Sequence, residues 1–298
     1  MRVFVTGASG FVGSAVVAEL LSFGHEVRGL VRSADAAARL TQAGAHPLLG
    51  TLDDARVLRA GADWAEGVIH TAFHHDFSQF AQACTLDQRA IETLGETLLG
   101  SERPLLVTSG LARLAQGRPA TEDDLPPPRS DAYPRVSEAA AQALQARGVR
   151  AATVRLAPSV HGAGDHGFVP MLIQIARQRG VSAYVGDGLN QWSAVHRLDA
   201  ARLYRLALAS TSPAPRLHAV GEEGIPFREI AEAIGRGLGL PTVSLSPQEA
   251  SGHFGAWFSH FPAAELSGAS QATRERLGWS PSHPGLLEDL SEGFYFQA

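Results

Sequence analysis

The chain begins with an apolar strand, a glycine-rich turn and an apolar helix, an order that leaves few folds open. Residues 3–5 are a short apolar run, and residues 11–21 repeat apolar side chains at helical spacing. Gly7 allows a positive φ, Gly10 lets a ligand approach the backbone, and Gly13 lets the helix pack against the strand. The first N–H groups of that helix are then available to phosphate. A glycine-rich turn can be only a turn, but between a strand and a helix it predicts a dinucleotide site.

The first half of the chain continues to alternate between apolar strand patterns and helical patterns. This alternation predicts an α/β fold, a Rossmann-type doubly wound parallel sheet with helices on both faces. The expected strands are 26–31, 47–49, 67–71, 105–108 and 151–156, and the expected helices are 36–43, 55–59, 85–100 and 137–147.

The pattern loosens in the second half. Residues 157–167 are expected to form a loop with glycines and histidines, and the last quarter reads as irregular. The helical patterns here are 168–179, 199–209 and 227–238. We expect a cofactor-binding domain over 1–160, to which 191–220 return. A small C-terminal substrate lobe is expected over 161–190 and 221–298.

Composition excludes several classes of protein. The net charge of −5 without a basic block argues against a nucleic-acid partner, and no apolar run reaches the roughly 18 residues of a membrane span. Cys84 is the single cysteine, so neither an internal disulfide nor a cysteine-rich metal site is expected. The chain enters a strand at once without a signal peptide, which favours a cytoplasmic location. All 25 basic residues are arginine, so no step can use a lysine ammonium.

Six short stretches, in order, resemble the extended or atypical short-chain dehydrogenase/reductases of the NAD-dependent epimerase/dehydratase type. They are Thr6–Gly13 (TGxxGxxG), Leu52-Asp53 (adenine contact), 68–72 (fourth strand), 107–109 (catalytic strand), 155–162 (RPxxVYG) and 194–201 (HVDD). The resemblance implies a cofactor held by Thr6, Gly7, Ser9, Gly10, Phe11, Val12, Gly13, Leu52, Asp53, Thr71, Ala72 and Pro158. It also implies a homodimer through helices 86–100 and 137–147.

The second strand ends in residues that favour NADP(H) over NAD(H). NAD sites usually place a carboxylate there for the ribose 2′-hydroxyl, whereas this chain has Val31, then Arg32 and Ser33. An arginine can bind a 2′-phosphate with two charge-assisted hydrogen bonds. Arg32 can also be one of many surface arginines, and nearby Asp35 weakens the charge argument.

The catalytic motif of the family is altered in this chain. Members use a Tyr-x-x-x-Lys pair, and counting four residues on from Tyr133 reaches Ser137. Aligning Ser137-Glu138 with the common Ser-Lys instead puts Pro134 in the tyrosine slot. In either alignment the lysine is absent. The usual catalytic hydroxyl falls at Gly110.

Two functions fit this altered site. In the first, the protein reduces a small hydrophobic aldehyde, ketone or imine: Tyr133 donates the proton with help from the charge of Arg135, and Ser109, with Thr108 beside it, orients the substrate oxygen. In the second, it binds NADP(H) as a redox sensor or partner-binding protein with little catalysis. Epimerase or dehydratase activity on a sugar-type substrate is a further alternative from the resemblance.

Histidine and aromatic residues complete the expected site. His70, His74 and His75 start from a strand and have no further ligand nearby in sequence, so no metal is expected. The ends of parallel strands meet at one edge, which places residues after the fourth strand in the cleft. His161 is either a substrate-facing acid or a structural histidine. The expected substrate contacts are Phe73, His74, Phe77, His161, Phe168 and Trp192, although most of the later aromatics can equally form the core of the small lobe.

Overall fold

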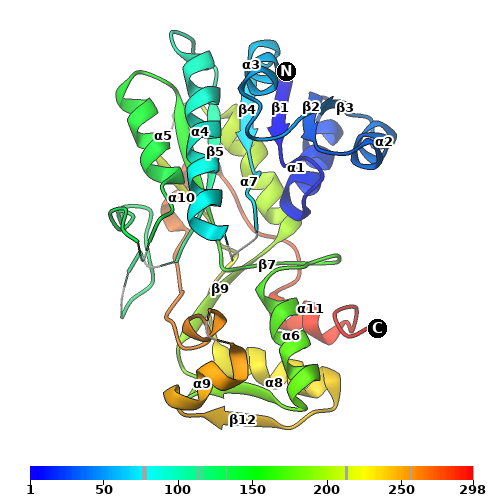
Figure 1. Cartoon of the computed structure of the whole chain (residues 1–298), viewed down its shortest axis with the longest axis vertical. Coiled ribbons are helices and arrows are strands. Elements are labelled where there is room, and N and C mark those ends of the chain that lie inside the picture. Colours follow the sequence, from blue (N-terminus) through cyan, green and yellow to red (C-terminus); the bar gives the residue numbers. More distant parts are fainter. Residues whose placement is uncertain are drawn as a thin grey trace.

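The computed structural model describes residues 1–75, 79–112, 114–115, 117–131, 133–211, 214–255 and 257–297. A large parallel sheet with its helices forms one part of the molecule, and a smaller lobe hangs below it (Figure 1). In the described residues, no helix is long and apolar enough to cross a membrane.

Seven parallel strands form the large sheet, as the alternating pattern predicts. Their order is β10-β6-β5-β4-β1-β2-β3, and all six neighbouring pairs are parallel. The strands are β1 Arg2–Thr6, β2 Glu26–Val31, β3 His46–Leu49, β4 Gly67–His70, β5 Leu105–Gly110, β6 Ala151–Leu156 and β10 Arg216–Ala219. The order reverses between β1 and β4, which is where ligands bind in open α/β sheets.

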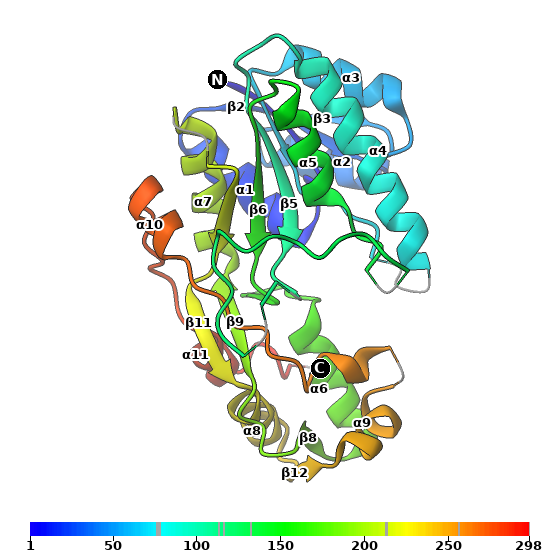
Figure 2. The ribbon, with the colours of Figure 1, turned by 90° about the vertical axis from the view of Figure 1, so that its left-hand side faces the viewer.

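Helices cover both faces of this sheet because its strands are apolar on both sides. Val3 and Val5 pack into one core and Phe4 into the other, and all three side chains are fully buried. Figure 2 shows α7 on one side of β5 and β6, and α4 and α5 on the other. The helices are α1 Phe11–Ser22, α2 Ala34–Gln42 and α7 Arg197–Ala209 on the first face, and α3 Ala55–Trp64, α4 Phe80–Leu98 and α5 Ser137–Ala146 on the second.

The smaller lobe has its own core, in which aromatic rings pack against one another. Phe168 lies 4.9 Å from Phe261 and 5.9 Å from Trp192, measured between ring centroids. Its elements are α6 Phe168–Arg179, β8 Ser182–Val185, α8 Phe227–Leu238, β12 Thr242–Leu245, α9 Pro247–Phe254, a 3-10 turn Phe258–His260 and α11 Leu286–Ser291. A three-stranded sheet of β7 Ser159–His161, β9 Gln191–His196 and β11 Glu222–Pro226 joins the two parts.

Three segments differ from the sequence-based expectation. Residues 159–161, expected in a loop, form β7 because they pair in parallel with β9. The last quarter is more regular than expected: Ser246 and Glu249 make a complete capping box at the start of α9. Helix α10 (Gln271–Leu277) contacts β10 and α7, and Trp279 is buried in the same core and donates to the Asp199 carbonyl of α7, so this segment lies against the large sheet rather than in the small lobe.

Candidate cofactor and active site

The glycine turn after β1 has the geometry that its sequence predicts. Gly7 has a φ of +70°, and the N–H of Gly10 donates to the Gly7 carbonyl at 2.9 Å. A Cβ on Gly7 would lie 2.7 Å from the Ala72 nitrogen, and one on Gly13 would run into the Gly7 carbonyl oxygen. Both positions therefore require glycine if α1 is to start close against β1 and β4.

The start of α1 is open to an anion. Gly10 caps the helix with extended backbone, no side chain caps it in the described structure, and no acidic residue lies in the first turn. The positive end of the helix dipole and the first N–H groups thus lie where the strand order reverses, and no negative side chain in the first turn offsets them. A dinucleotide pyrophosphate fits this cradle, with Gly7, Ser9, Gly10, Phe11, Val12 and Gly13 as the residues that would hold it.

Replacing Gly13 with alanine should disturb this cradle. The added methyl must push α1 away from the Gly7 carbonyl, a case of overpacking that costs about 1–3 kcal/mol. We expect a lower melting temperature and an affinity for a nicotinamide dinucleotide at least about tenfold weaker, measured by quenching of protein fluorescence. Ser14→Ala, at an exposed position one residue on, is the control and should bind the dinucleotide like the wild type. Unchanged affinity in Gly13→Ala would place the cofactor elsewhere.

The residues expected at the adenine end lie beyond β2 and β3. Val31 is buried, Arg32 is exposed, and the Ser33 hydroxyl accepts from the Ala36 N–H as the cap of α2. Asp53 is exposed, and a hydrogen bond from Thr51 lowers the pKa of its carboxyl. Leu52 is half-buried against the core. In the described residues no carboxylate lies within 4.0 Å of Arg32, so its guanidinium is available to a ligand.

A buried chain of hydrogen bonds runs from the glycine turn to the cleft. The Thr6 hydroxyl lies 2.8 Å from Nδ1 of His70, and Nε2 of His70 lies 3.0 Å from Oδ1 of Asp87. The Ser137 hydroxyl donates to the other oxygen of Asp87 at 2.5 Å, and Nε of Arg135 donates to Ser137 at 3.1 Å. His70, considered above as a metal ligand, is fully engaged here. Asp87 was not predicted as a site residue. The sequence feature that could have indicated it is a carboxylate on the apolar face of a helix.

Arg135 is the cation that this chain holds at the ends of β4 and β5. Its guanidinium lies 4.6 Å from the centre of the Phe73 ring and donates to the Thr108 carbonyl at 3.4 Å. Burial raises the pKa of the half-buried Tyr133 phenol above its usual value, and the charge of Arg135 opposes that rise. Tyr133 is therefore protonated at neutral pH, the form that a general acid requires.

The Thr108 hydroxyl is already committed. It donates to the His70 carbonyl at 2.7 Å and lies 2.6 Å from the hydroxyl of the fully buried Tyr204. Its single proton is taken, so Thr108 cannot donate to a substrate oxygen, which corrects the expectation above. Ser109 is buried, and the alternation of a strand directs it to the opposite face of the sheet. Nothing lies within 4 Å of a Cβ added to Gly110.

A carboxylate occupies the lysine slot in one of the two alignments. Glu138 forms a buried, bidentate pair with Arg155, at 2.9 Å to Nε and 2.6 Å to Nη2. Arg155 also donates to the carbonyls of Thr121 and Asp124, and lies 3.1 Å from Nε2 of His218. Glu138 therefore ties β6 and the 121–124 segment to α5, whereas Arg135 acts on the Tyr133 phenol and, among the described residues, has no carboxylate within 4.0 Å.

Only some of the expected substrate contacts lie at the sheet edge near Arg135. Phe73 is half-buried against Arg135 and His74 is exposed, whereas Phe77 lies outside the described residues. His161 is fully buried with Nδ1 2.6 Å from Asp289, which supports the structural alternative over a substrate-facing acid and removes His161 from the expected substrate contacts. Trp192 is also fully buried in the core of the small lobe, and Phe168 packs on it there. The Trp192 ring fills the lobe, and the half-buried Phe168 ring packs against it.

A histidine–aspartate group lies near the start of α7. His196, Asp199 and His283 place potential ligand atoms within 4.8 Å of one another. Asp199 already accepts from the backbone N–H groups of Ser282 and His283 and lies 2.9 Å from Nδ1 of the His283 ring. We interpret this group as the link that fastens the 279–283 segment to α7.

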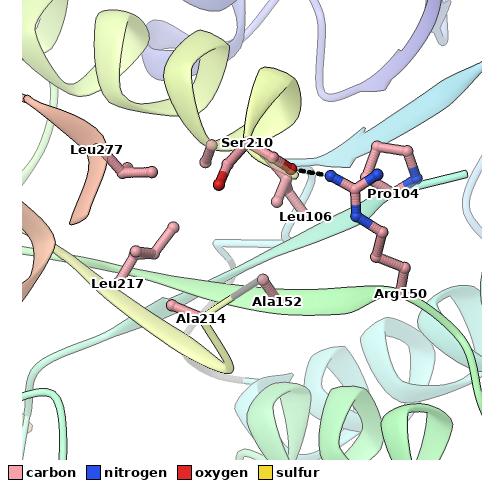
Figure 3. Close-up of a pocket in the computed structure, with 9 residues that line it drawn as sticks. Pro104, Leu106, Arg150, Ala152, Ser210, Ala214, Leu217 and Leu277 are labelled. Carbon is pink, nitrogen blue, oxygen red and sulfur yellow. Dashed lines mark hydrogen bonds between the residues drawn. The ribbon is translucent and has the colours of Figure 1, made fainter. Parts of the chain in front are cut away.

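A small apolar pocket lies at the opposite end of the large sheet (Figure 3). Pro104 and Arg150, at the starts of β5 and β6, line it, and Arg150 donates to the Ser210 carbonyl. Its free volume of about 10 Å³ holds at most one water molecule. This pocket has no room for a dinucleotide, so it is not part of the candidate site at the glycine turn.

Comparison with known proteins shows which family the chain matches and which proteins it is similar to. The model of the NAD dependent epimerase/dehydratase family matches residues 3–221. An uncharacterised protein of Schizosaccharomyces pombe is 50% identical over 299 residues, covering 99% of this chain and 100% of the relative. The 4-hydroxy-2-methyl-3-oxo-4-farnesyl-3,4-dihydroquinoline-1-oxide ketoreductase of Stigmatella aurantiaca is 35% identical over 191 residues, 60% of this chain and 56% of the relative. The UDP-glucose 4-epimerase of Thermus thermophilus, solved with NAD, shares the fold with a TM-score of 0.75 at 22% identity, over 100% of both chains.

Proposed function

The chain belongs to the NAD dependent epimerase/dehydratase family, and we propose that it is an NADP(H)-dependent oxidoreductase that reduces a hydrophobic aldehyde, ketone or imine. The observation that carries the proposal is the uncapped start of α1 at the end of the sheet where Arg135 donates to the Thr108 carbonyl, with the Tyr133 phenol within the influence of the Arg135 charge. A site with an anion cradle, a cation and a protonated phenol has the parts of a carbonyl reductase. The name of the Stigmatella relative, a ketoreductase for a farnesylated substrate, supports a hydrophobic ketone.

Each residue of the chain has a separate task in this proposal. Bound NADP(H) supplies the hydride. Tyr133 donates the proton to the reduced oxygen or nitrogen, and Arg135 keeps positive charge beside the phenol. Ser137 and Asp87 hold Nε of Arg135 in place. Ser109 stays the candidate for orienting the substrate oxygen, because Thr108 has no proton to give.

Arg32 supports NADP(H) as the cofactor. Replacing it with methionine should weaken NADPH binding by about 10- to 100-fold, since a charge-assisted contact to the 2′-phosphate contributes about 1.5–3 kcal/mol. NADH has no such phosphate, so its affinity should not change. The control is Arg39→Met, because Arg39 is also exposed but lies on α2. Both variants are compared with the wild type by fluorescence titration. Tighter binding of NADH than NADPH by the wild type would contradict this cofactor choice.

Turnover decides whether the protein is a reductase. NADPH oxidation should be followed against panels of hydrophobic aldehydes, ketones and imines, with matched polar and sugar-type carbonyls beside them. Preferential turnover of the hydrophobic members is the expected result. Epimerisation and dehydration consume no NADPH overall, so that alternative is tested by product analysis of a nucleotide sugar incubated with the protein and the oxidised cofactor. Conversion there, with no reduction of the carbonyl panel, would instead support the epimerase or dehydratase alternative.

A binding protein with little catalysis is the second candidate, and two observations favour it. The lysine slot holds Glu138 in a closed ion pair, and Gly110 carries no hydroxyl. In that case NADPH binds but no member of the panel is reduced.

A further inference from the structure

The basic side chains of Arg197 and His166 lie at the start of α1. Both come from segments far from the glycine turn in sequence. Phe11 is the first residue of α1, and the guanidinium carbon of Arg197 lies 5.2 Å from the centre of its ring. The His166 ring meets the same phenylalanine edge-on at 5.8 Å. Arg197 begins α7, directly after β9, and His166 lies between β7 and α6. Three segments therefore converge where the phosphate-binding helix begins.

Arg197 has no counter-ion there. In the part of the chain that the structure describes, no carboxylate lies within 4.0 Å of its guanidinium, although the residue is half-buried. Arg205, on the same helix, shows the usual alternative: its Nε lies 2.7 Å from Glu19 while its guanidinium stacks on Phe23. A half-buried guanidinium with no carboxylate, beside an uncapped helix start, is suited to an anionic ligand.

The loop that follows β7 passes close to Arg197. Gly162 has a φ of +129°, and a Cβ there would lie 2.9 Å from Nε2 of His196 and 3.4 Å from Cγ of Arg197. A Cβ on Gly164 would lie 4.0 Å from Nη1 of Arg197. The residues 162–166 thus run beside the arginine and bring the His166 ring into contact with Phe11.

We propose that Arg197, with His166 beside it, is a second half of the pyrophosphate site, opposite the glycine turn. The helix N–H groups would bind one side of the diphosphate, and the guanidinium would pair with the other. This inference rests on the proposed dinucleotide binding and adds a residue to it. It makes cofactor binding depend on the β9–α7 junction as well as on the first 13 residues.

Binding of cofactor fragments tests the inference without any turnover. NADPH, ADP-ribose and adenosine 2′-monophosphate should be titrated calorimetrically into wild type, Arg197→Met, Arg197→Lys and the control Arg236→Met, an exposed arginine on α8. Arg197→Met should weaken NADPH and ADP-ribose about tenfold or more and leave adenosine 2′-monophosphate unchanged. Arg197→Lys should lose less, because it keeps the charge without the planar fork.

Different outcomes overturn different claims. Wild-type affinity of Arg197→Met for ADP-ribose would overturn the role of Arg197 and leave dinucleotide binding intact. Equal weakening of all three ligands would also overturn it, because the variant would then disturb the whole site. Failure of the wild type to bind any dinucleotide would overturn the proposed function itself. Circular dichroism melting of each variant separates a loss of binding from a loss of fold.

Discussion

Replacing Tyr133 with phenylalanine will lower kcat of the reductase by about 10²- to 10⁴-fold, the usual contribution of a positioned general acid. The affinity for NADPH will stay unchanged, because the phenol lies outside the glycine cradle. Burial raises the pKa of this phenol, so it is protonated up to and beyond its usual pKa of about 10. The wild-type rate should therefore not fall between pH 7 and pH 9 through loss of this proton.

Steady-state kinetics on the best substrate of the panel measure this effect. Tyr184→Phe, which removes the hydroxyl of a half-buried tyrosine in the small lobe, is the matched control and should leave kcat unchanged. If Tyr133→Phe keeps wild-type kcat, another group supplies the proton, and Ser109 is the first to replace next.

Replacing Glu138 with glutamine will destabilise the protein by about 3–5 kcal/mol, since it leaves the fully buried Arg155 charge unpaired. Urea unfolding followed by circular dichroism measures the loss. Glu232→Gln removes the carboxylate of an exposed pair with Arg228 at 3.7 Å, and it should cost less than about 1 kcal/mol. Similar small losses in both variants would show that the Glu138–Arg155 pair contributes little.

The Glu138–Arg155 pair also predicts what happens when the lysine of the family is introduced at position 138. Glu138→Lys would place an ammonium against Arg155 within a buried site, so the variant should unfold rather than gain activity. Changing Glu138 and Arg155 together to methionine should recover much of the lost stability, because both fully buried charges are then removed, while Arg216, 4.0 Å from Glu138, still donates to the Glu122 carbonyl. A folded, more active Glu138→Lys would contradict both the pairing and its structural role.

The fold was predictable where local pattern and tertiary environment agree. Strand Glu26–Val31 and helices Phe168–Arg179 and Phe227–Leu238 have the bounds that their apolar spacing predicts. Strand β7 was missed because three residues carry no period, and pairing with β9 alone makes them a strand. Helix α9 was missed although Ser246, Pro247 and Glu249 are typical of a helix start.

The candidate site was also predictable only where it depends on residues close together in sequence. The glycine turn is local, so its spacing alone indicated the cradle. The Asp87–Ser137–Arg135 chain joins residues up to 50 positions apart, and no sequence spacing encodes it. His161 and Trp192 were misplaced for a related reason: their neighbours in sequence suggested the cleft, but their partners Asp289 and Phe261 lie far along the chain.

By itself, the sequence determined the doubly wound sheet, the phosphate cradle and the absence of a lysine, because each follows from local spacing or composition. Only the tertiary structure decided which polar groups are still available for chemistry. It engages Thr108 with His70 and Tyr204, closes Glu138 on Arg155, and leaves Arg135 and Arg197 without a carboxylate among the described residues. The physical reason is that a side chain's hydrogen-bonding capacity is finite, and long-range packing determines which partner uses it.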